Sequence, residues 1–140
     1  MGTITVNAPV ETVFEAVSDL TRHAGWAAHE IGITAESEGP VEVGHIYSSG
    51  KSGDKLDKIT VTEHTPNDRF GFHVVMPNGW ELDWLISLTA KGEGTEVDRK
   101  VKVTKMPLHM KPMLLAIAMV GPIFERKMAK KMKADIEGTD

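Results

Sequence analysis

The stretch GTEVDRKVKVT, from Gly94 to Thr104, has the alternating pattern of a β-strand and lies just before the last segment of the chain. Valine occupies alternate positions of this stretch, but at one place in the row the residue is Arg99. Successive side chains of a strand point to opposite faces of a sheet, so Arg99 lies on the same face as Val97 and Val101. We therefore expect a strand whose apolar face carries one cation.

After Pro107 the apolar residues take the spacing of an α-helix and keep it almost to the end of the chain. One face of this helix is apolar and contains Ile117, Val120, Phe124, Met128, Met132 and Ile136. Pro122 lies within the helix, so we expect the helix to kink or to divide there. An amphipathic helix that follows a run of strands buries its apolar stripe against one face of their sheet.

The sequence before these two segments predicts one strand, two short helices and five further strands, in a single α+β domain over residues 1–140. Residues 3–7 alternate as a strand does, and Pro9 suits the first turn of the helix that follows. Asp19 is suited to cap a second short helix, which ends near Trp26. Turn residues then separate six strands, counting the one with Arg99, at about 30–37, 43–50, 55–65, 68–76, 80–90 and 95–105.

The lengths of three turns predict how the last four strands pair. A turn at Pro66-Asn67, a loop at residues 77–79 with Gly79 left-handed, and a turn at Gly92-Glu93 connect them. The pairs that follow are Glu63 with Phe70, Met76 with Trp80, and Ile86 with Arg99. The inner face then has two apolar rows and two bordering rows: Val61, Phe72, Trp84, Val101; Ile59, Val74, Leu82, Val103; Glu63, Phe70, Ile86, Arg99; and Asp57, Met76, Trp80, Lys105.

The position of Arg99 has three interpretations, because a charge is too costly to bury among apolar groups without compensation. Its guanidinium reaches Glu63 in the same row, about 14 Å away in a flat sheet and nearer in a strongly coiled one. Alternatively, the side chain extends past a sheet rim to solvent. In the third interpretation, Arg99 faces a cavity between sheet and helix that holds water or the polar end of a ligand.

Three stretches resemble the START/SRPBCC superfamily, which includes polyketide cyclases and dehydrases, plant pollen-allergen-like proteins and lipid-transfer domains. They are ITVNAPVETVFEAVSDLTRHAGW (residues 4–26), VTEHTPNDRFGF (residues 61–72) and GEGTEVDRKVKVT (residues 92–104). In that family the opening reads as a strand, Ala-Pro, a helix with Val-Phe, then Asp-Leu and a tryptophan. Here the matching residues are Ala8, Pro9, Val13, Phe14, Asp19, Leu20 and Trp26.

The resemblance implies the helix-grip fold: a seven-stranded, curved antiparallel sheet wrapped around the long C-terminal helix, with two short helices between strands 1 and 2. It also implies a hydrophobic cavity between sheet and helix. Members of the family bind lipids, sterols, polyketides or other apolar molecules there, and a minority catalyse reactions. Fold alone does not decide between these functions.

The predicted function is therefore the binding or carrying of a small hydrophobic ligand, such as a lipid, a polyketide or an aromatic molecule. Arg99, together with Glu63, would orient the polar end of the ligand. Tyr47 is a further candidate, although Ile46 competes with it for the inward position. The other predicted ligand-binding residues are Phe70, Phe72, Trp80, Trp84 and Ile86 on the sheet and Met113, Ile117 and Phe124 on the helix. In the competing interpretation, these aromatic and methionine side chains are simply packed core.

An enzyme of the polyketide cyclase, aromatase or dehydrase type is the alternative. Such a reaction needs a positioned base, a donor for the enolate oxygen and a shaped apolar slot. Residues of types suited to these roles are Tyr47, Glu63, Arg99, His45 and Asp57. They form no catalytic motif, so no catalytic residue is predicted. The six histidines lack zinc-site spacing and there is no cysteine, so we expect no metal and no cofactor.

Charge and hydropathy limit the predicted partners. A formal net charge of −4 gives no reason to expect nucleic acid. The longest apolar run, from Met113 to Phe124, is shorter than the ~20 residues that span a bilayer, so we expect no stable membrane insertion. Without cysteines or a secretion signal, the expected location is the cytoplasm, as a monomer or homodimer.

The segment ERKMAKKMKAD, residues 125–135, contains five lysines and arginines. It could rest on an anionic membrane surface, but a solvated helix face with cations near its C-terminal end is the simpler interpretation. A third functional hypothesis is an interaction module of the kind that includes ribosome-associated and coenzyme-Q-binding relatives. In that hypothesis, the gripped helix forms the binding surface.

Overall fold

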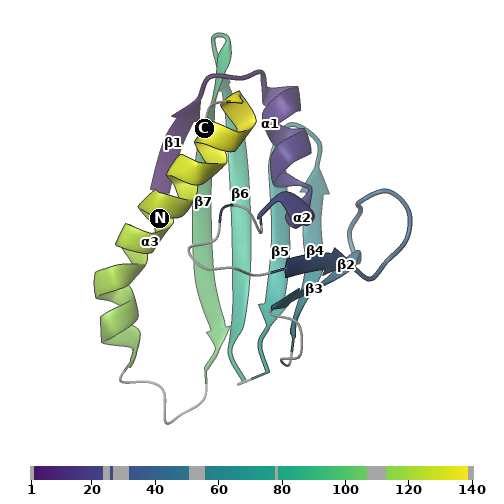
Figure 1. The fold of residues 1–140 in the computed structure, drawn as a ribbon, viewed down its shortest axis with the longest axis vertical. Coiled ribbons are helices and arrows are strands. Elements are labelled where there is room, and N and C mark those ends of the chain that lie inside the picture. The colour runs from purple at the N-terminus through teal and green to yellow at the C-terminus, as the bar shows by residue number, and fades with distance from the viewer. Residues whose placement is uncertain are drawn as a thin grey trace.

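The computed structural model describes residues 2–23, 26, 32–50, 56–77, 79–106 and 113–138. Its elements follow the predicted order of one strand, two short helices, six strands and one long helix (Figure 1). Their bounds are β1 Gly2–Val6, α1 Val10–Val17, α2 Leu20–His23, β2 Gly32–Ala35, β3 Ile46–Gly50, β4 Asp57–Thr65, β5 Arg69–Val75, β6 Glu81–Lys91, β7 Gly94–Lys105 and α3 Met113–Glu137.

The strands form one antiparallel sheet of seven strands in the order β1-β7-β6-β5-β4-β3-β2. Strands β2 to β7 therefore make a meander, and β1 pairs with β7 at the far edge. Figure 1 shows α3 running obliquely along β1, with α1 and α2 beside it. Helix α1 contacts β5, β6 and β7, and α2 contacts β2. The predicted α+β fold, with a curved sheet and a long C-terminal helix, is confirmed.

Strand register confirms the predicted place of Arg99 opposite Ile86. Both predicted apolar rows are also present, since Val61 pairs with Phe72 and the rows continue through β6 and β7. The three-residue loop before β6 is confirmed by a 2.8 Å hydrogen bond from the Met76 amide to the Trp80 carbonyl. Gly79 has a φ of 97°, a conformation that costs glycine little.

The predicted pairing of Glu63 with Phe70 is wrong, because a β-bulge between Val61 and Glu63 shifts the register. His64 pairs with Phe70, and Glu63 pairs with Gly71. The connection after β4 has three residues rather than two: the Thr65 carbonyl accepts from the Asp68 amide at 3.0 Å, and Asn67 has a φ of 62°. One extra residue moves the next side chain to the opposite face, so Glu63 leaves the row of Arg99.

Two further expectations need correction. Lys105 pairs with Glu81 rather than with Trp80, because the ladder is irregular between Glu81 and Leu82. Of the two outcomes expected at Pro122, a kink or a division, the division is wrong, since α3 continues over 25 residues. Proline removes one backbone donor, and the remaining hydrogen bonds of a long helix can bridge that gap.

The C-terminal half of α3 is attached to the sheet edge and to α2 by polar contacts. Lys133 Nζ donates to the Thr5 carbonyl at 2.8 Å, and Glu137 accepts from the Asn7 amide at 2.8 Å. Asp135 accepts from Arg22 Nη2 at 3.0 Å and from the indole of Trp26 at 3.1 Å. Met132, between these contacts, is completely buried in the core. Among the described residues, none of the helices has the length and hydropathy needed to span a bilayer.

Candidate functional site

Arg99 lies inside the molecule, on the face of β7 that carries Val97. Only 2% of the residue is exposed, so the interpretation that it extends to solvent is wrong. Its Cζ atom lies 5.3 Å from the centroid of the Trp84 ring, and Nη2 lies 3.4 Å from Met128 Sδ on α3. The guanidinium therefore lies between the inner face of the sheet and the long helix.

This environment suits a permanent cation better than an ordinary hydrocarbon core does. Arginine stays protonated in proteins. The face of an indole ring attracts a desolvated cation by about 2 kcal/mol, and the Met128 thioether is a weak acceptor. Glu63 does not take part in the way predicted, because its carboxylate pairs with Arg69 Nε at 3.1 Å. The inner face thus presents positive charge among aromatic and sulfur groups.

His23 is a second buried polar group of this interior, and 4% of it is exposed. Its Nε2 lies 2.8 Å from the Val17 carbonyl; because a carbonyl can only accept, Nε2 donates and Nδ1 of the neutral ring is an acceptor. The ring centroid lies 4.4 Å from that of Trp26 and 6.0 Å from that of Phe72. Burial lowers the pKa of His23 to about 4, with the charge of Arg99 acting in the same direction. His23 is therefore neutral at physiological pH.

The burial of His23 was not predicted, because the six histidines were considered only as possible metal ligands. A signal was available, because Leu20 and His23 are three residues apart and so share one face of a helix. Leu20 is one of the most buried side chains of the molecule. A histidine on the same face is therefore expected to point into the core.

Tyr47 faces inward on β3, opposite Ile59, and is 1% exposed. His45 and Ser49 share its phase and are buried too, whereas Ile46 is half-buried, so the competition left open by the sequence is decided for Tyr47. Burial raises the pKa of the Tyr47 phenol, and the negative charge of Asp19 adds to this. The phenol therefore stays protonated and can donate a hydrogen bond.

Aromatic rings cover the inner face of β5 and β6. Phe72 stacks on Trp84 with centroids 6.2 Å apart and an interplanar angle of 18°, and Phe70 lies 5.8 Å from Phe72. Phe70, Phe72, Ile86 and Trp80 are all buried. Among the apolar residues predicted on the sheet, Trp84 is half-buried.

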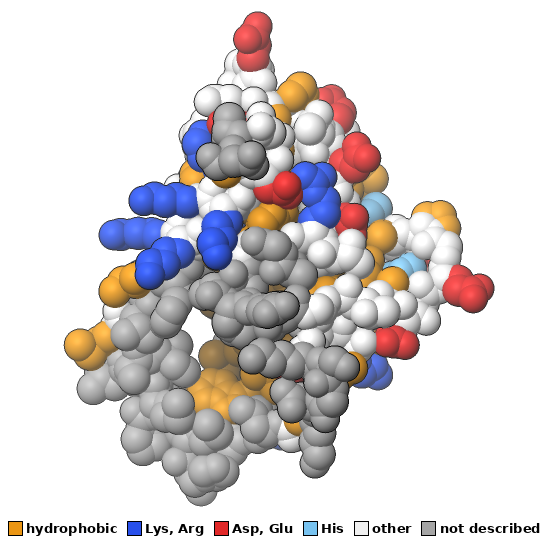
Figure 2. All heavy atoms as spheres, in the orientation of Figure 1, with side chains coloured by type: hydrophobic (Ala, Val, Ile, Leu, Met, Phe, Trp, Pro, Cys, Tyr) orange, Lys and Arg blue, Asp and Glu red, His pale blue; other side chains and the backbone are white. Residues whose placement is uncertain are grey.

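The inner face is not uniformly covered. Its side chains are fully or nearly fully buried near α1 but only half-buried toward the other end of β6 and β7, at Leu82, Trp84, Val101 and Val103. Figure 2 shows a hollow in the lower half of this view, with hydrophobic side chains at its floor. The predicted helix residues Met113, Ile117 and Phe124 lie on α3, but their side chains are outside the described part of the structure.

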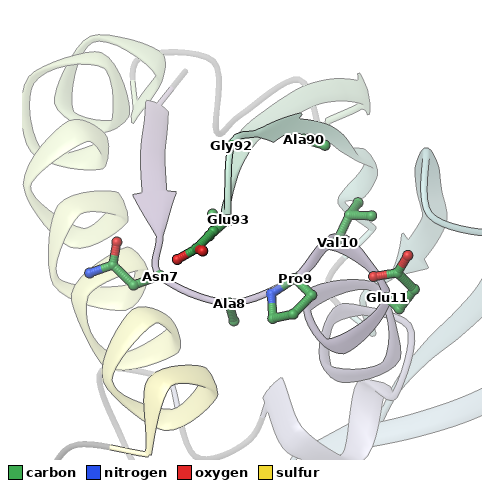
Figure 3. Close-up of a pocket in the computed structure, with 9 residues that line it drawn as sticks. Asn7, Ala8, Pro9, Val10, Glu11, Ala90, Gly92 and Glu93 are labelled. Carbon is green, nitrogen blue, oxygen red and sulfur yellow. The ribbon is translucent and has the colours of Figure 1, made fainter.

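A separate pocket of about 720 Å³ opens where β1, α1 and the β6–β7 hairpin meet (Figure 3). Its lining is mostly backbone and small side chains, with Glu93 and Asn7 on one side and Glu11 on the other. None of the predicted ligand-binding residues lines it. The described residues that line it include no aromatic side chain and no cation, so we assign no function to it.

The residues that the structure describes contain no group of three or more histidine, aspartate or glutamate side chains that could hold a metal ion. On the outer sheet face, His73 lies between two carboxylates, with Nδ1 2.6 Å from Asp83 and Nε2 2.9 Å from Glu81. Both hydrogen bonds raise the pKa of His73. This arrangement is an ion-pair network between neighbouring strands, remote from the inner face.

A curved antiparallel sheet with a long C-terminal helix along one face and two short helices after its first strand defines the helix-grip class of proteins. The family described as "Polyketide cyclase / dehydrase and lipid transport" matches residues 2–137, and this chain belongs to that family. No curated protein sequence matches the chain.

Solved structures share the fold at low sequence identity. A START superfamily protein from Mycobacterium smegmatis is 18% identical, with a TM-score of 0.71 over 98% of this chain and 95% of its own. The di-domain ARO/CYC StfQ from the steffimycin biosynthetic pathway is 14% identical, with a TM-score of 0.68 over 97% of this chain and 44% of its own. DynU16, a protein in the dynemicin biosynthetic locus, is 25% identical, with a TM-score of 0.58 over 96% of this chain and 46% of its own.

Proposed function

We propose that this protein binds and carries a small hydrophobic ligand, such as a lipid, a polyketide or an aromatic molecule, between the inner sheet face and α3. The observation that carries the proposal is the uneven burial of that face. Leu82, Trp84, Val101 and Val103 are apolar and point inward, yet they are only half-buried. Apolar surface left open inside a fold is the usual lining of a ligand site. The family description, which includes lipid transport, supports the same assignment.

Within this site, Arg99 would orient the polar end of the ligand, and Trp84 would contact its apolar body. Tyr47 would add a neutral donor from β3. The pairing of Glu63 with Arg69 leaves Arg99 to act without Glu63. Met113, Ile117 and Phe124 would line the helix side.

Native mass spectrometry of protein purified from its own host tests the proposal. We expect a co-purified small molecule, and we expect its affinity to fall about 10- to 100-fold in Arg99→Met if Arg99 binds its polar end. Lys100→Met is the matched control, because Lys100 is the exposed neighbour on the opposite face of β7. Carriage is excluded if no ligand co-purifies and if fatty acids, sterols and aromatic polyketides all fail to bind the purified protein.

An enzyme of cyclase, aromatase or dehydrase type is the second candidate, because three groups suited to such chemistry share the interior. Neutral His23 has an acceptor nitrogen, the Tyr47 phenol is a donor, and Arg99 can stabilise an enolate oxygen. A base with a pKa of about 4 removes protons weakly at neutral pH, so carriage remains the first proposal.

Incubation with a polyketide chain, followed by mass spectrometry of the products, separates these two functions. An enzyme converts the chain, with turnover abolished in Tyr47→Phe or His23→Gln while binding persists. A carrier returns the ligand unchanged, and the same two variants leave it unchanged as well.

A further inference from the structure

Helix α3 has an outward stripe whose apolar part continues into a cationic part. Met119 is 70% exposed and Ile123 is 53% exposed, the largest such exposures on the described part of this helix. Arg126, Lys127 and Lys130 follow, and all three are exposed. With 3.6 residues per turn, these five positions fall within an arc of about 100°. Met128 and Met132 lie on the opposite side of the helix, against the core.

The stripe differs from an ordinary solvated helix face in two respects. Two large apolar side chains, at i and i+4, are exposed side by side instead of being covered. Two acidic groups near the end of the helix are engaged elsewhere: Asp135 with Arg22, and Glu137 with Lys133 and the Asn7 amide. Figure 2 shows Lys and Arg side chains gathered over α3, with hydrophobic side chains beyond them on the same edge of the molecule.

We propose that this stripe docks the protein on the surface of an anionic lipid bilayer. Met119 and Ile123 would enter the boundary between headgroups and acyl chains, and Arg126, Lys127 and Lys130 would contact the anionic headgroups. A helix with an apolar part and cations on its outer side lies in the plane of such an interface.

Charge complementarity selects this partner. The chain has a formal net charge of −4, so an anionic surface repels the protein as a whole. Attraction therefore depends on local charge, and the stripe concentrates three exposed cations beside two exposed apolar side chains. Each cation near an anionic membrane raises binding about fivefold at physiological ionic strength. The proposal requires no spanning helix, and it holds whether or not the interior carries a ligand.

Co-sedimentation of the full chain with vesicles tests the proposal. We expect binding to vesicles that contain phosphatidylglycerol, little binding to phosphatidylcholine alone, and a decrease at high salt. Lys127→Gln/Lys130→Gln should weaken binding about 25-fold, since two cations are lost. Met119→Ser/Ile123→Ser should weaken it about tenfold at unchanged net charge, since apolar burial is lost.

The matched control is Lys100→Gln/Lys102→Gln, which removes the same charge from exposed positions on the outer face of β7. We expect this variant to bind vesicles as the unmodified protein does or within about twofold of it. Equal losses in the two double-lysine variants would overturn the proposal, because net charge and not the stripe would then control binding. Failure of the unmodified protein to bind anionic vesicles would also overturn it and would leave an acidic protein as the occupant. Circular dichroism confirms that each variant is folded.

Discussion

Arg99 is buried as a whole side chain, since only 2% of the residue is exposed. Its Cζ atom lies 5.3 Å from the Trp84 ring centroid, and Nη2 lies 3.4 Å from Met128 Sδ. Buried arginines contribute packing as well as charge, because the three methylene groups of the stem fill space. Volume and charge can be separated by substitution.

Two substitutions at Arg99 measure the packing of the stem. We expect Arg99→Ala to be less stable than Arg99→Met by about 2 kcal/mol, because both lose the charge but only alanine leaves a void. The difference is the change in the free energy of unfolding, measured by urea denaturation. Equal stabilities would mean that the stem, and not only the guanidinium, borders open space.

His23 links burial to pH, since its pKa is about 4 in the folded protein and 6.5 in the unfolded chain. Between these values the unfolded state binds more protons, so stability decreases as pH falls from about 6.5 to about 4. The contribution of His23 to the free energy of unfolding is fully present above pH 6.5. It amounts to about 3 kcal/mol, which is lost as the pH falls to about 4. His23→Gln keeps a donor for the Val17 carbonyl but cannot be protonated.

Urea denaturation between pH 4 and pH 7 checks this expectation. The free energy of unfolding should fall more steeply with acid in the unmodified protein than in His23→Gln. Carboxylates titrate in both proteins, so the difference between the two curves reports His23. Parallel curves would show that the imidazole is accessible to water in the folded state.

At the scale of elements, α3 has two distinct sides. Its inner side supplies Met132, with 0% exposure, and its outer side supplies Met119, with 70% exposure. Lys133, Asp135 and Glu137 connect the same half of the helix to β1 and α2. The attachment of α3 to the rest of the fold therefore depends on buried methionine contacts and on the polar contacts around them.

Alanine substitutions at the two methionines test this division. We expect Met132→Ala to reduce the free energy of unfolding by about 2–4 kcal/mol, because a buried side chain leaves a cavity. Met119→Ala should change it by less than about 0.5 kcal/mol, because its side chain has few contacts to lose. Denaturant titrations of the two variants give the comparison, and similar losses would contradict this assignment of the two sides.

For the molecule as a whole, the proposed ligand would complete the core. A ligand that binds only the folded state adds about 2.7 kcal/mol of stability at a hundred times its dissociation constant. We therefore expect protein stripped of bound molecules and refolded to melt at a lower temperature than protein as isolated, with recovery when the extracted molecules are returned. Identical melting curves would show that the interior is stable without an occupant.

Much of the architecture was predictable because it depends on local spacing. Alternation, helical periodicity and turn residues predicted the order of the elements and the two apolar rows of the inner face. The same alternation placed Arg99 opposite Ile86. These features involve residues close together in the chain or connected by short turns, so the sequence alone determined them.

The tertiary structure decided what depends on residues far apart. The bulge in β4 puts His64 in the place expected for Glu63, with its ring 5.3 Å from Phe14 of α1. Tyr47 points inward and His23 is buried because their neighbours come from other elements. A one-residue change of register inverts a face, and burial is the sum of contacts across the whole fold. Neither the register of β4 nor the burial of a side chain follows from local spacing. The residues that form the candidate site could therefore be identified only from the tertiary structure.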